Sequence, residues 1–342
     1  MSEEKLEMTK LLKKLFIILG VVSITLASVG CSNMEQNQIP EVEVQAEDFE
    51  TVQYTYSDGA QTHEVLVTSP RKRAVTLSQF MTEMLLALGL EDQIVATALL
   101  DNPILPEFEE AYNKIPILEV GEGHAISKEA FVATGADFVS GWDSSISDQT
   151  TGSAEELIAK DIAPFMAKSY DSDATVETVY EDFELLGRLF DVQDRAQEVI
   201  NQMQNNIKAV TDKVGTIKEE DKVKMMVYDS GVNDAMVVGS GLANNLIEMA
   251  GGKNVFAEDA TKPYINVSWE SVVAKNPEVI LVTDFIAGEP VENKIDVLKS
   301  HPALKDVPAI KNNKIYVVGL ADLSPGVRNA KVIEQMYGYF FE

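Results

Sequence analysis

The side chains that most often carry chemistry are few and widely spaced in this sequence. Its 342 residues include one cysteine, Cys31, and three histidines, at positions 63, 124 and 301. One cysteine allows neither an internal disulfide nor a cysteine-based zinc site, and three isolated histidines are unlike the clustered ligands of bare zinc or manganese ions. We therefore expect no metal ion held by side chains alone and no resident cofactor.

The motifs of common enzyme active sites are missing too. Gly239-Ser240-Gly241 begins like a dinucleotide-binding loop but lacks its third glycine, and neither a Walker A lysine motif nor a G-x-S-x-G turn occurs. A triad of residues distant in sequence would leave no local pattern. We expect a protein that is not an enzyme, with a cell-surface hydrolase or an adhesin as the alternative of a different class.

The charge of the chain restricts its partners. Asp and Glu number 55 against 28 Lys and Arg, a net charge of −27, and the longest basic run is Arg71-Lys72-Arg73. Such a surface repels polyanions, so we expect no nucleic-acid partner. An apolar share of 45% over this length is enough for two packed domains or one large one.

Cys31 ends a segment typical of an exported lipoprotein. Basic residues precede an apolar run over 15–26, which is too short for a comfortable transmembrane span. Small residues lead into the cysteine as in a bacterial lipobox, although Ser28 stands where leucine is usual. The alternative is a buried free cysteine.

We expect residues 1–31, translated from the first methionine or from Met8, to be a lipoprotein signal peptide and lipobox. Lipidated Cys31 would then anchor the protein to the extracytoplasmic face of the cell membrane, in either a Gram-positive or a Gram-negative cell. Residues 32–50 are polar, acidic and aperiodic, which predicts a flexible linker.

Alternating strand and helix patterns follow. A β-hairpin is predicted around Ser57-Asp58-Gly59, and a helix over 81–88. Buried strands are predicted at 74–77, 94–98, 138–140, 164–166, 225–228, 279–283 and 315–318. Their alternation with helices predicts parallel α/β sheets.

A long helical pattern divides the folded part. Apolar residues recur every three to four positions over 176–214, with a break at Asp191-Val192-Gln193. A helix over 193–215 would be about 30 Å long, enough to bridge two lobes. We expect this helix to join an N-terminal and a C-terminal α/β lobe, over 51–192 and 216–342.

An internal repeat also indicates two similar lobes. Residues 126–139 align with 267–280, so that Glu129 matches Glu270. Each copy predicts a serine N-cap, a short helix, a turn and a buried strand. The alternative is that any two helix-and-strand units look alike over so short a length.

Together these segments resemble the class III solute-binding proteins of ABC importers, which carry iron–siderophore complexes, haem or vitamin B12. The resemblance runs from about Thr51 to Phe341. Its motifs are the hairpin turn, Arg73-Ala-Val-Thr-Leu-Ser, Thr82-Glu-Met-Leu-Leu-Ala-Leu-Gly89, both Ser-x-Glu units, Asn245-Leu-Ile-Glu-Met-Ala-Gly-Gly-Lys-Asn-Val-Phe256 and Ser324-Pro-Gly-Val-Arg328. It implies two Rossmann-like lobes with mainly parallel sheets, joined by one long rigid helix, with the ligand in the cleft between them.

The resemblance also implies a docking partner. Glu129 and Glu270 match the family's two glutamates, one per lobe, that pair with arginines of the permease. An exposed carboxylate suits such contacts, although each glutamate could instead belong to a capped, solvated helix start. We expect a monomer that works with an ABC permease and its ATPase.

For the ligand, the resemblance points to loops at the carboxyl ends of the strands. The candidate binding residues are Ser78, Gln79, Phe80, His124, Trp142, Asp143, Asp229, Met236, Tyr264, Ser324 and Arg328. Trp142 and Tyr264 would supply flat apolar area, unless Trp142 belongs to the core.

Two further roles follow if the ligand is charged or is haem. Arg328 would pair with an anionic ligand, or instead bridge to one of the acids. His124 or Met236 would ligate haem iron, unless His124 is ordinary polar surface. We expect a ferric siderophore, with cobalamin or haem as alternatives in the same role.

Overall fold

The structure is a computed structural model, and it describes residues 49–121 and 125–342. The predicted signal peptide, Cys31, the linker up to residue 48 and His124 lie outside the described residues. Residues 48–342 group into one compact unit, so the predicted limits of the two lobes stay predictions. In the described part, no helix is long and apolar enough to cross a membrane.

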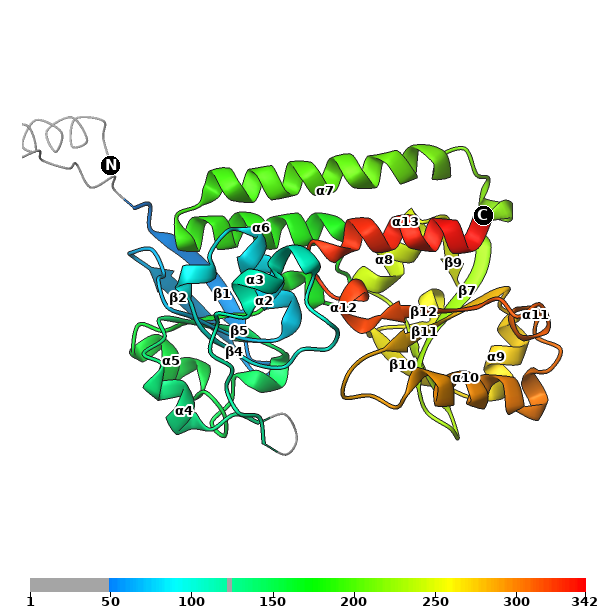
Figure 1. Cartoon of the computed structure of the whole chain (residues 1–342), viewed down its shortest axis with the longest axis horizontal. Helices are drawn as coiled ribbons and strands as arrows, with labels where there is room; N and C mark the ends of the chain where they lie inside the picture. Colours follow the sequence, from blue (N-terminus) through cyan, green and yellow to red (C-terminus); the bar gives the residue numbers. More distant parts are fainter. Residues whose placement is uncertain (1–48, 122–124) are drawn as a thin grey trace, which may run out of the picture. The chain divides into compact units, whose positions relative to one another are not determined.

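Strands and helices alternate along the described chain (Figure 1). The strands are β1 (Val52–Ser57), β2 (Thr62–Val67), β3 (Ala74–Leu77), β4 (Ile94–Thr97), β5 (Phe138–Gly141), β6 (Ala163–Phe165), β7 (Val223–Ser230), β8 (Ala235–Val238), β9 (Gly252–Asn254), β10 (Tyr264–Val267), β11 (Val279–Asp284) and β12 (Ile315–Gly319). The helices are α2 (Gln79–Ala87), α3 (Glu109–Tyr112), α4 (Lys128–Ala133), α5 (Ala154–Ala159), α6 (Val176–Phe190), α7 (Gln193–Val214), α8 (Leu242–Met249), α9 (Trp269–Lys275), α10 (Val291–Ser300), α11 (Pro308–Lys311), α12 (Leu320–Leu323) and α13 (Arg328–Phe341).

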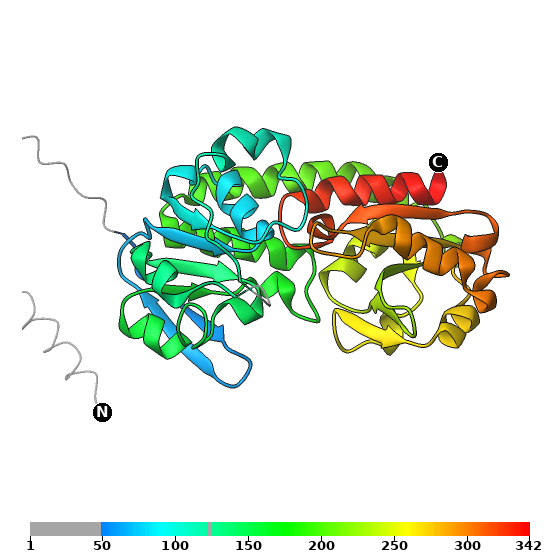
Figure 2. The same cartoon turned by 60° about the horizontal axis from the view of Figure 1, so that its bottom comes forward.

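The first lobe, residues 49–190, contains the predicted parallel sheet. Its strand order is β4-β3-β5-β6, and every pairing is parallel. All residues of β3 and β5 are buried, as expected for strands covered on both faces. The predicted hairpin is confirmed as β1 and β2, and Figure 2 shows its tip projecting from this lobe.

The second lobe, residues 223–342, contains a mixed sheet of order β10-β8-β7-β11-β12, with β9 paired to β7. Strands β7, β9, β11 and β12 are parallel, β8 runs antiparallel to β7, and β10 pairs antiparallel with β8. Only residues 231–234 separate β7 from β8, and such a short connection returns the chain antiparallel. Gly231 permits this turn, because at its φ of 100° a Cβ would lie 2.1 Å from the Asp234 carbonyl oxygen.

The predicted long helix and its break are both confirmed. Helix α6 ends where Asp191 adopts a left-handed φ of 58°, and α7 begins at Gln193. Gly187 lets the two helices pack closely, since a Cβ there would lie 2.7 Å from the Cβ of Ala196. At 1.5 Å per residue α7 is about 33 Å long, and Figure 1 shows it lying along both lobes, over α6 and α13.

The internal repeat is confirmed as two equivalent structural units. Ser127 and Ser268 are the N-caps of α4 and α9, and each hydroxyl accepts a hydrogen bond of 3.2 Å from a backbone N–H three residues later. The buried strands β5 and β11 follow these helices. Each of these two units therefore carries a serine-capped helix with a glutamate in its first turn.

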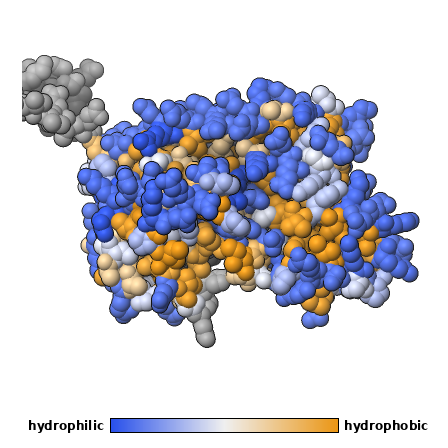
Figure 3. All heavy atoms as spheres, in the orientation of Figure 1, coloured by the Kyte–Doolittle hydropathy of each residue, from blue (hydrophilic) through white to orange (hydrophobic). Residues whose placement is uncertain are grey.

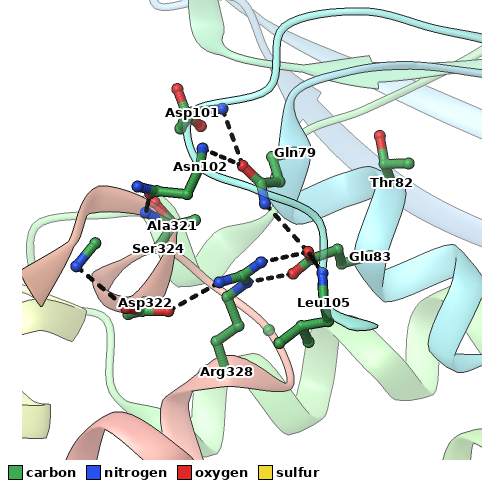
Figure 4. Close-up of polar contacts among 12 residues, drawn as sticks. Gln79, Thr82, Glu83, Asp101, Asn102, Leu105, Ala321, Asp322, Ser324 and Arg328 are labelled. Carbon is green, nitrogen blue, oxygen red and sulfur yellow. Dashed lines mark hydrogen bonds and ion pairs between the residues drawn. The ribbon is translucent and has the colours of Figure 1, made fainter. Parts of the chain in front are cut away.

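A buried ion pair joins the two lobes. The guanidinium of Arg328, on α13, donates to both carboxylate oxygens of Glu83, on α2, at 2.6 and 2.7 Å (Figure 4). It also donates to Asp322 at 3.0 Å. The side chains of Glu83 and Arg328 are 3% and 11% exposed, so this contact is almost fully removed from solvent.

Asn102 makes a second contact between the lobes. Its side-chain amide donates to the Asp284 carbonyl oxygen and accepts from the backbone N–H of Ala321, both at 2.9 Å. The buried Gln79 fixes this loop, because its amide oxygen accepts from the backbone N–H groups of Asp101 and Asn102 (Figure 4). The two lobes are thus held by directional contacts in addition to α7.

The ion pair yields a stability prediction. Glu83→Ala leaves the buried Arg328 guanidinium without its bidentate partner, and we expect the free energy of unfolding to fall by about 3 kcal/mol. Urea denaturation measures this change. As a control, Glu110→Ala removes an exposed carboxylate paired with Lys114 and should cost less than about 1 kcal/mol. Equal losses in both variants would show that the buried pair between the lobes stabilises the fold no more than an exposed ion pair does.

Candidate functional site

A cavity of about 220 Å³ lies between the two lobes at the carboxyl ends of their strands. Trp142 follows β5, Phe285 follows β11, Leu320 follows β12, and Asp229 lies near the end of β7. Ligands of open α/β sheets bind at these strand ends. A larger groove of about 700 Å³ lies instead along α7 and α13, away from the strand ends. Figure 3 shows the surface hollowed between the lobes, with apolar area on both sides.

Aromatic side chains form much of the cavity wall. Trp142 packs edge-on against Phe80 and Tyr170, with ring centroids 5.1 and 5.4 Å away. Gly141 brings Trp142 to this place, because a Cβ at residue 141 would lie 2.6 Å from the Cβ of Leu77 on β3. Phe80 is buried behind Trp142, so it fixes the indole ring without lining the cavity.

Tyr264 stands on the second lobe, at the start of β10. Burial raises the pKa of its phenol, and the charge of Asp229 raises it further, so the hydroxyl stays protonated and can donate a hydrogen bond. Each lobe therefore supplies at least one aromatic ring with a polar edge to the cavity.

Asp229 is the most buried charged group in the cavity wall. It is 8% exposed, and its two carboxylate oxygens accept hydrogen bonds from the hydroxyls of Thr283, at 2.7 Å, and Ser230, at 3.0 Å. Asp171, on the opposite lobe, also lines the cavity. Partial burial, followed by the charge of Asp173, raises the pKa of Asp171. The charged part of the wall is thus acidic.

Five of the predicted ligand-binding residues line this cavity: Trp142, Asp229, Met236, Tyr264 and Ser324. Ser78, Gln79 and Phe80 lie behind the wall and support it. Ser78 caps α2, Gln79 holds the loop at Asn102, and Phe80 packs on Trp142. Trp142 is half-buried and lines the cavity as well as contacting the core.

Arg328 does not line the cavity, because Glu83 and Asp322 engage its guanidinium. Of its two predicted roles, the structure shows the bridge to acids. Asp143 begins a short 3₁₀ helix, and its side chain, like residue His124, lies outside the described part.

Several lining residues escaped the sequence analysis. Tyr170 belongs to a short 3₁₀ helix after β6, and Phe285 immediately follows β11. Because β11 was predicted as a strand, its end was a signal that pointed to Phe285. No comparable pattern marked Tyr170, whose place depends on how the loop after β6 folds back toward Trp142.

The two repeat glutamates are exposed at the starts of their helices. Hydrogen bonds from its own backbone N–H and from the Ser127 hydroxyl lower the pKa of Glu129, so this carboxylate stays charged. Glu270 occupies the equivalent place on α9. Neither glutamate lines the cavity, so any role they have is at the surface.

The described residues offer no set of side chains that could hold a bare metal ion. In this part of the chain, no three His, Cys, Asp or Glu side chains lie close enough together. The cavity offers instead aromatic faces, one thioether, hydroxyl groups and two carboxylates. Such an arrangement can enclose a sizeable organic molecule or metal complex.

Comparisons with known proteins agree with this architecture. The sequence profile described as periplasmic binding protein matches residues 75–319. The uncharacterized ABC transporter substrate-binding lipoprotein YvrC of Bacillus subtilis is 22% identical over 290 residues, which is 84% of each chain. The vitamin B12-binding protein of Vibrio parahaemolyticus is 26% identical over 253 residues, which is 73% of this chain and 82% of the relative.

Solved structures share the fold. A periplasmic binding protein from Veillonella parvula has a TM-score of 0.77 and 27% identity, covering 85% of this chain and 98% of the other. An ABC-type Fe³⁺-hydroxamate transport system protein from Saccharomonospora viridis has a TM-score of 0.69 and 24% identity, covering 84% and 99%. The profile match spans more than half of the chain and includes the strands that frame the cavity. The chain belongs to the periplasmic binding protein family.

Proposed function

We propose that this protein is the extracytoplasmic substrate-binding protein of an ABC importer, and that it captures a ferric siderophore and delivers it to the permease without chemistry of its own. The observation that carries the proposal is the aromatic cavity between the lobes, at the strand ends where ligands of this architecture bind. The relation to substrate-binding proteins of ABC transporters supports it.

The cavity wall suits a metal complex better than a bare ion. Trp142, Tyr170, Tyr264 and Phe285 offer ring faces and edges to the organic shell of a complex. At about 220 Å³ the cavity is smaller than most pockets for organic ligands. A siderophore-sized ligand therefore needs the lobes to separate, or it keeps part of its surface in solvent.

Cobalamin is the second candidate ligand. The vitamin B12-binding protein of Vibrio parahaemolyticus supports this candidate by its name and its similarity over 73% of this chain. The corrin ring is broad and flat, and Trp142 and Tyr264 would contact it from opposite lobes. Haem remains a third ligand for the same cavity.

The proposal also assigns Glu129 and Glu270 as the docking residues for the permease. Each glutamate is exposed on its own lobe, in the first turn of a serine-capped helix. Val132 and Val273, three residues further along and equivalent in the repeat, are 57% and 39% exposed. Each docking site thus combines a carboxylate for an arginine with an apolar neighbour.

The first prediction concerns ligand binding. The chain has two tryptophans, Trp142 in the cavity wall and Trp269 buried in the second lobe with its N–H bound to the Val232 carbonyl oxygen. We expect ferric siderophores to quench the fluorescence of Trp142, so that Trp142→Phe abolishes most of the quenching and Trp269→Phe preserves it. Trp142→Ala should also weaken affinity by about tenfold or more, measured by calorimetry. Unchanged affinity would place the ligand elsewhere.

The second prediction concerns docking. Glu129→Ala with Glu270→Ala should keep the ligand affinity and lose most of the stimulation of ATP hydrolysis by an ABC permease and ATPase reconstituted in liposomes. The matched control is Glu110→Ala with Glu220→Ala, which removes one exposed carboxylate before α7 and one after it. Full stimulation by the first double variant would rule out the docking assignment.

The third prediction concerns the membrane anchor. We propose that Cys31 carries the lipid, which agrees with the lipoprotein description of YvrC. Cys31→Ser should move the protein from the membrane fraction to the soluble exported fraction, as seen by immunoblotting. Mass spectrometry of the wild-type protein should find a diacylated N-terminal cysteine. An unmodified wild-type Cys31 would contradict the assignment.

A further inference from the structure

We infer that the cavity selects a neutral or cationic metal complex and rejects anionic ones, with Asp229 as the selecting residue. This inference rests on the proposed function, because it concerns the ligand of the same cavity. The cavity would accept hydroxamate complexes of iron and cobalamin. It would reject anionic catecholate complexes, and haem because of its propionates.

The first support is the charge of the wall. The described residues that line the cavity include two carboxylates, Asp171 and Asp229, and no lysine or arginine. Asp101 lies close enough for its charge to raise the pKa of Tyr264. Both lobes therefore place a carboxylate on the wall, but Asp171 is exposed to solvent whereas Asp229 is buried.

The second support is that nearby cations are already engaged. Arg328 makes three charged contacts, with both oxygens of Glu83 and with Asp322. The Lys294 side chain is buried, and its ammonium donates to the Thr283 carbonyl oxygen at 2.9 Å and lies 4.4 Å from the Phe285 ring centroid. Neither cation lines the cavity. Arg328 is paired with Glu83 and Asp322, whereas Lys294 lies close enough to Asp229 and Asp284 for their charges to act on its pKa.

Two lysines stand next in sequence to lining residues, and both are exposed to solvent. Lys168 is 63% exposed and pairs with Glu181 at 3.8 Å, and Lys262, next to the lining residue Pro263, is exposed as well. Water and salt screen such charges strongly. Asp229, by contrast, is 8% exposed. Asp229 is therefore less screened by solvent than these lysines are.

Two hydrogen bonds orient the carboxylate of Asp229 at the cavity wall. Its oxygens accept hydrogen bonds from two hydroxyls, which stabilise a carboxylate without neutralising it. An anionic ligand would meet a like charge at low dielectric, whereas a cationic complex would be attracted. Neutral complexes would rely on the aromatic wall alone.

The test compares complexes of different charge on the full-length protein. Titrations would use ferrioxamine B as a cation, ferrichrome and cyanocobalamin as neutral complexes, and ferric enterobactin as an anionic catecholate. We expect at least one neutral or cationic complex to bind more tightly than ferric enterobactin, by about tenfold or more. Added salt should weaken a cationic ligand and leave a neutral one nearly unchanged.

Two variants locate the effect. Asp229→Asn should reduce the preference for the cationic over the anionic complex by about tenfold. Asp284→Asn removes the same charge from a neighbouring strand end outside the cavity lining and should leave that preference nearly unchanged. Thermal melting checks that both variants fold. If Asp229→Asn does not fold, the test uses the salt dependence of ligand affinity in the wild-type protein.

The outcomes distinguish this inference from the proposed function. Tightest binding of ferric enterobactin would overturn the charge selection and leave the protein a siderophore binder. Binding of cyanocobalamin alone would support the charge selection and replace the siderophore by cobalamin. Equal preferences in the Asp229→Asn and wild-type proteins would remove Asp229 from the selecting role. Binding of none of these complexes would overturn the proposed ligand class itself, and the charge selection with it.

Discussion

The buried ion pair between Glu83 and Arg328 is the contact on which the geometry of the site depends. It joins residues 245 positions apart, on α2 of the first lobe and α13 of the second. Burying two charges is unfavourable unless both find good partners, so the pair tolerates little displacement. Asn102 adds backbone contacts beside it. The width of the cavity follows from these few directional contacts, because Trp142 and Tyr264 stand on the lobes that they join.

The same ion pair keeps the guanidinium of Arg328 out of the cavity wall. The chain has 28 Lys and Arg against 55 Asp and Glu. One of these cations, Arg328, joins the lobes. Asp229 then acts on the cavity without an arginine or lysine beside it in the wall. In the proposed charge selection, stability and ligand preference would be coupled, because Arg328, which could otherwise pair with an anionic ligand, is paired with Glu83 between the lobes.

Local patterns in the sequence predicted those parts of the fold that local physics controls. The hairpin at Gly59, the break at Asp191 and the serine caps of α4 and α9 follow from backbone preferences over a few residues. Strand β8 was missed because its antiparallel course depends on the tight turn at Gly231, and β10, which pairs with β8, was missed with it. The pairing of Arg328 with Glu83 could not be predicted either. The sequence contains many acids that could pair with this arginine, and only the tertiary fold determines which of them lies beside it.

In the proposed docking, the position of α7 affects how empty and ligand-bound molecules compete for the permease. This one continuous helix lies along both lobes, and polar contacts join the lobes beneath it. A ligand that binds with part of its surface in solvent, without separating the lobes, would leave the distance between Glu129 and Glu270 little changed. In the proposed docking, a permease would then meet nearly the same pair of carboxylates on empty and occupied molecules. Empty protein becomes a competitor for the transporter, and the rate of uptake depends on the ratio of the two forms at the cell surface.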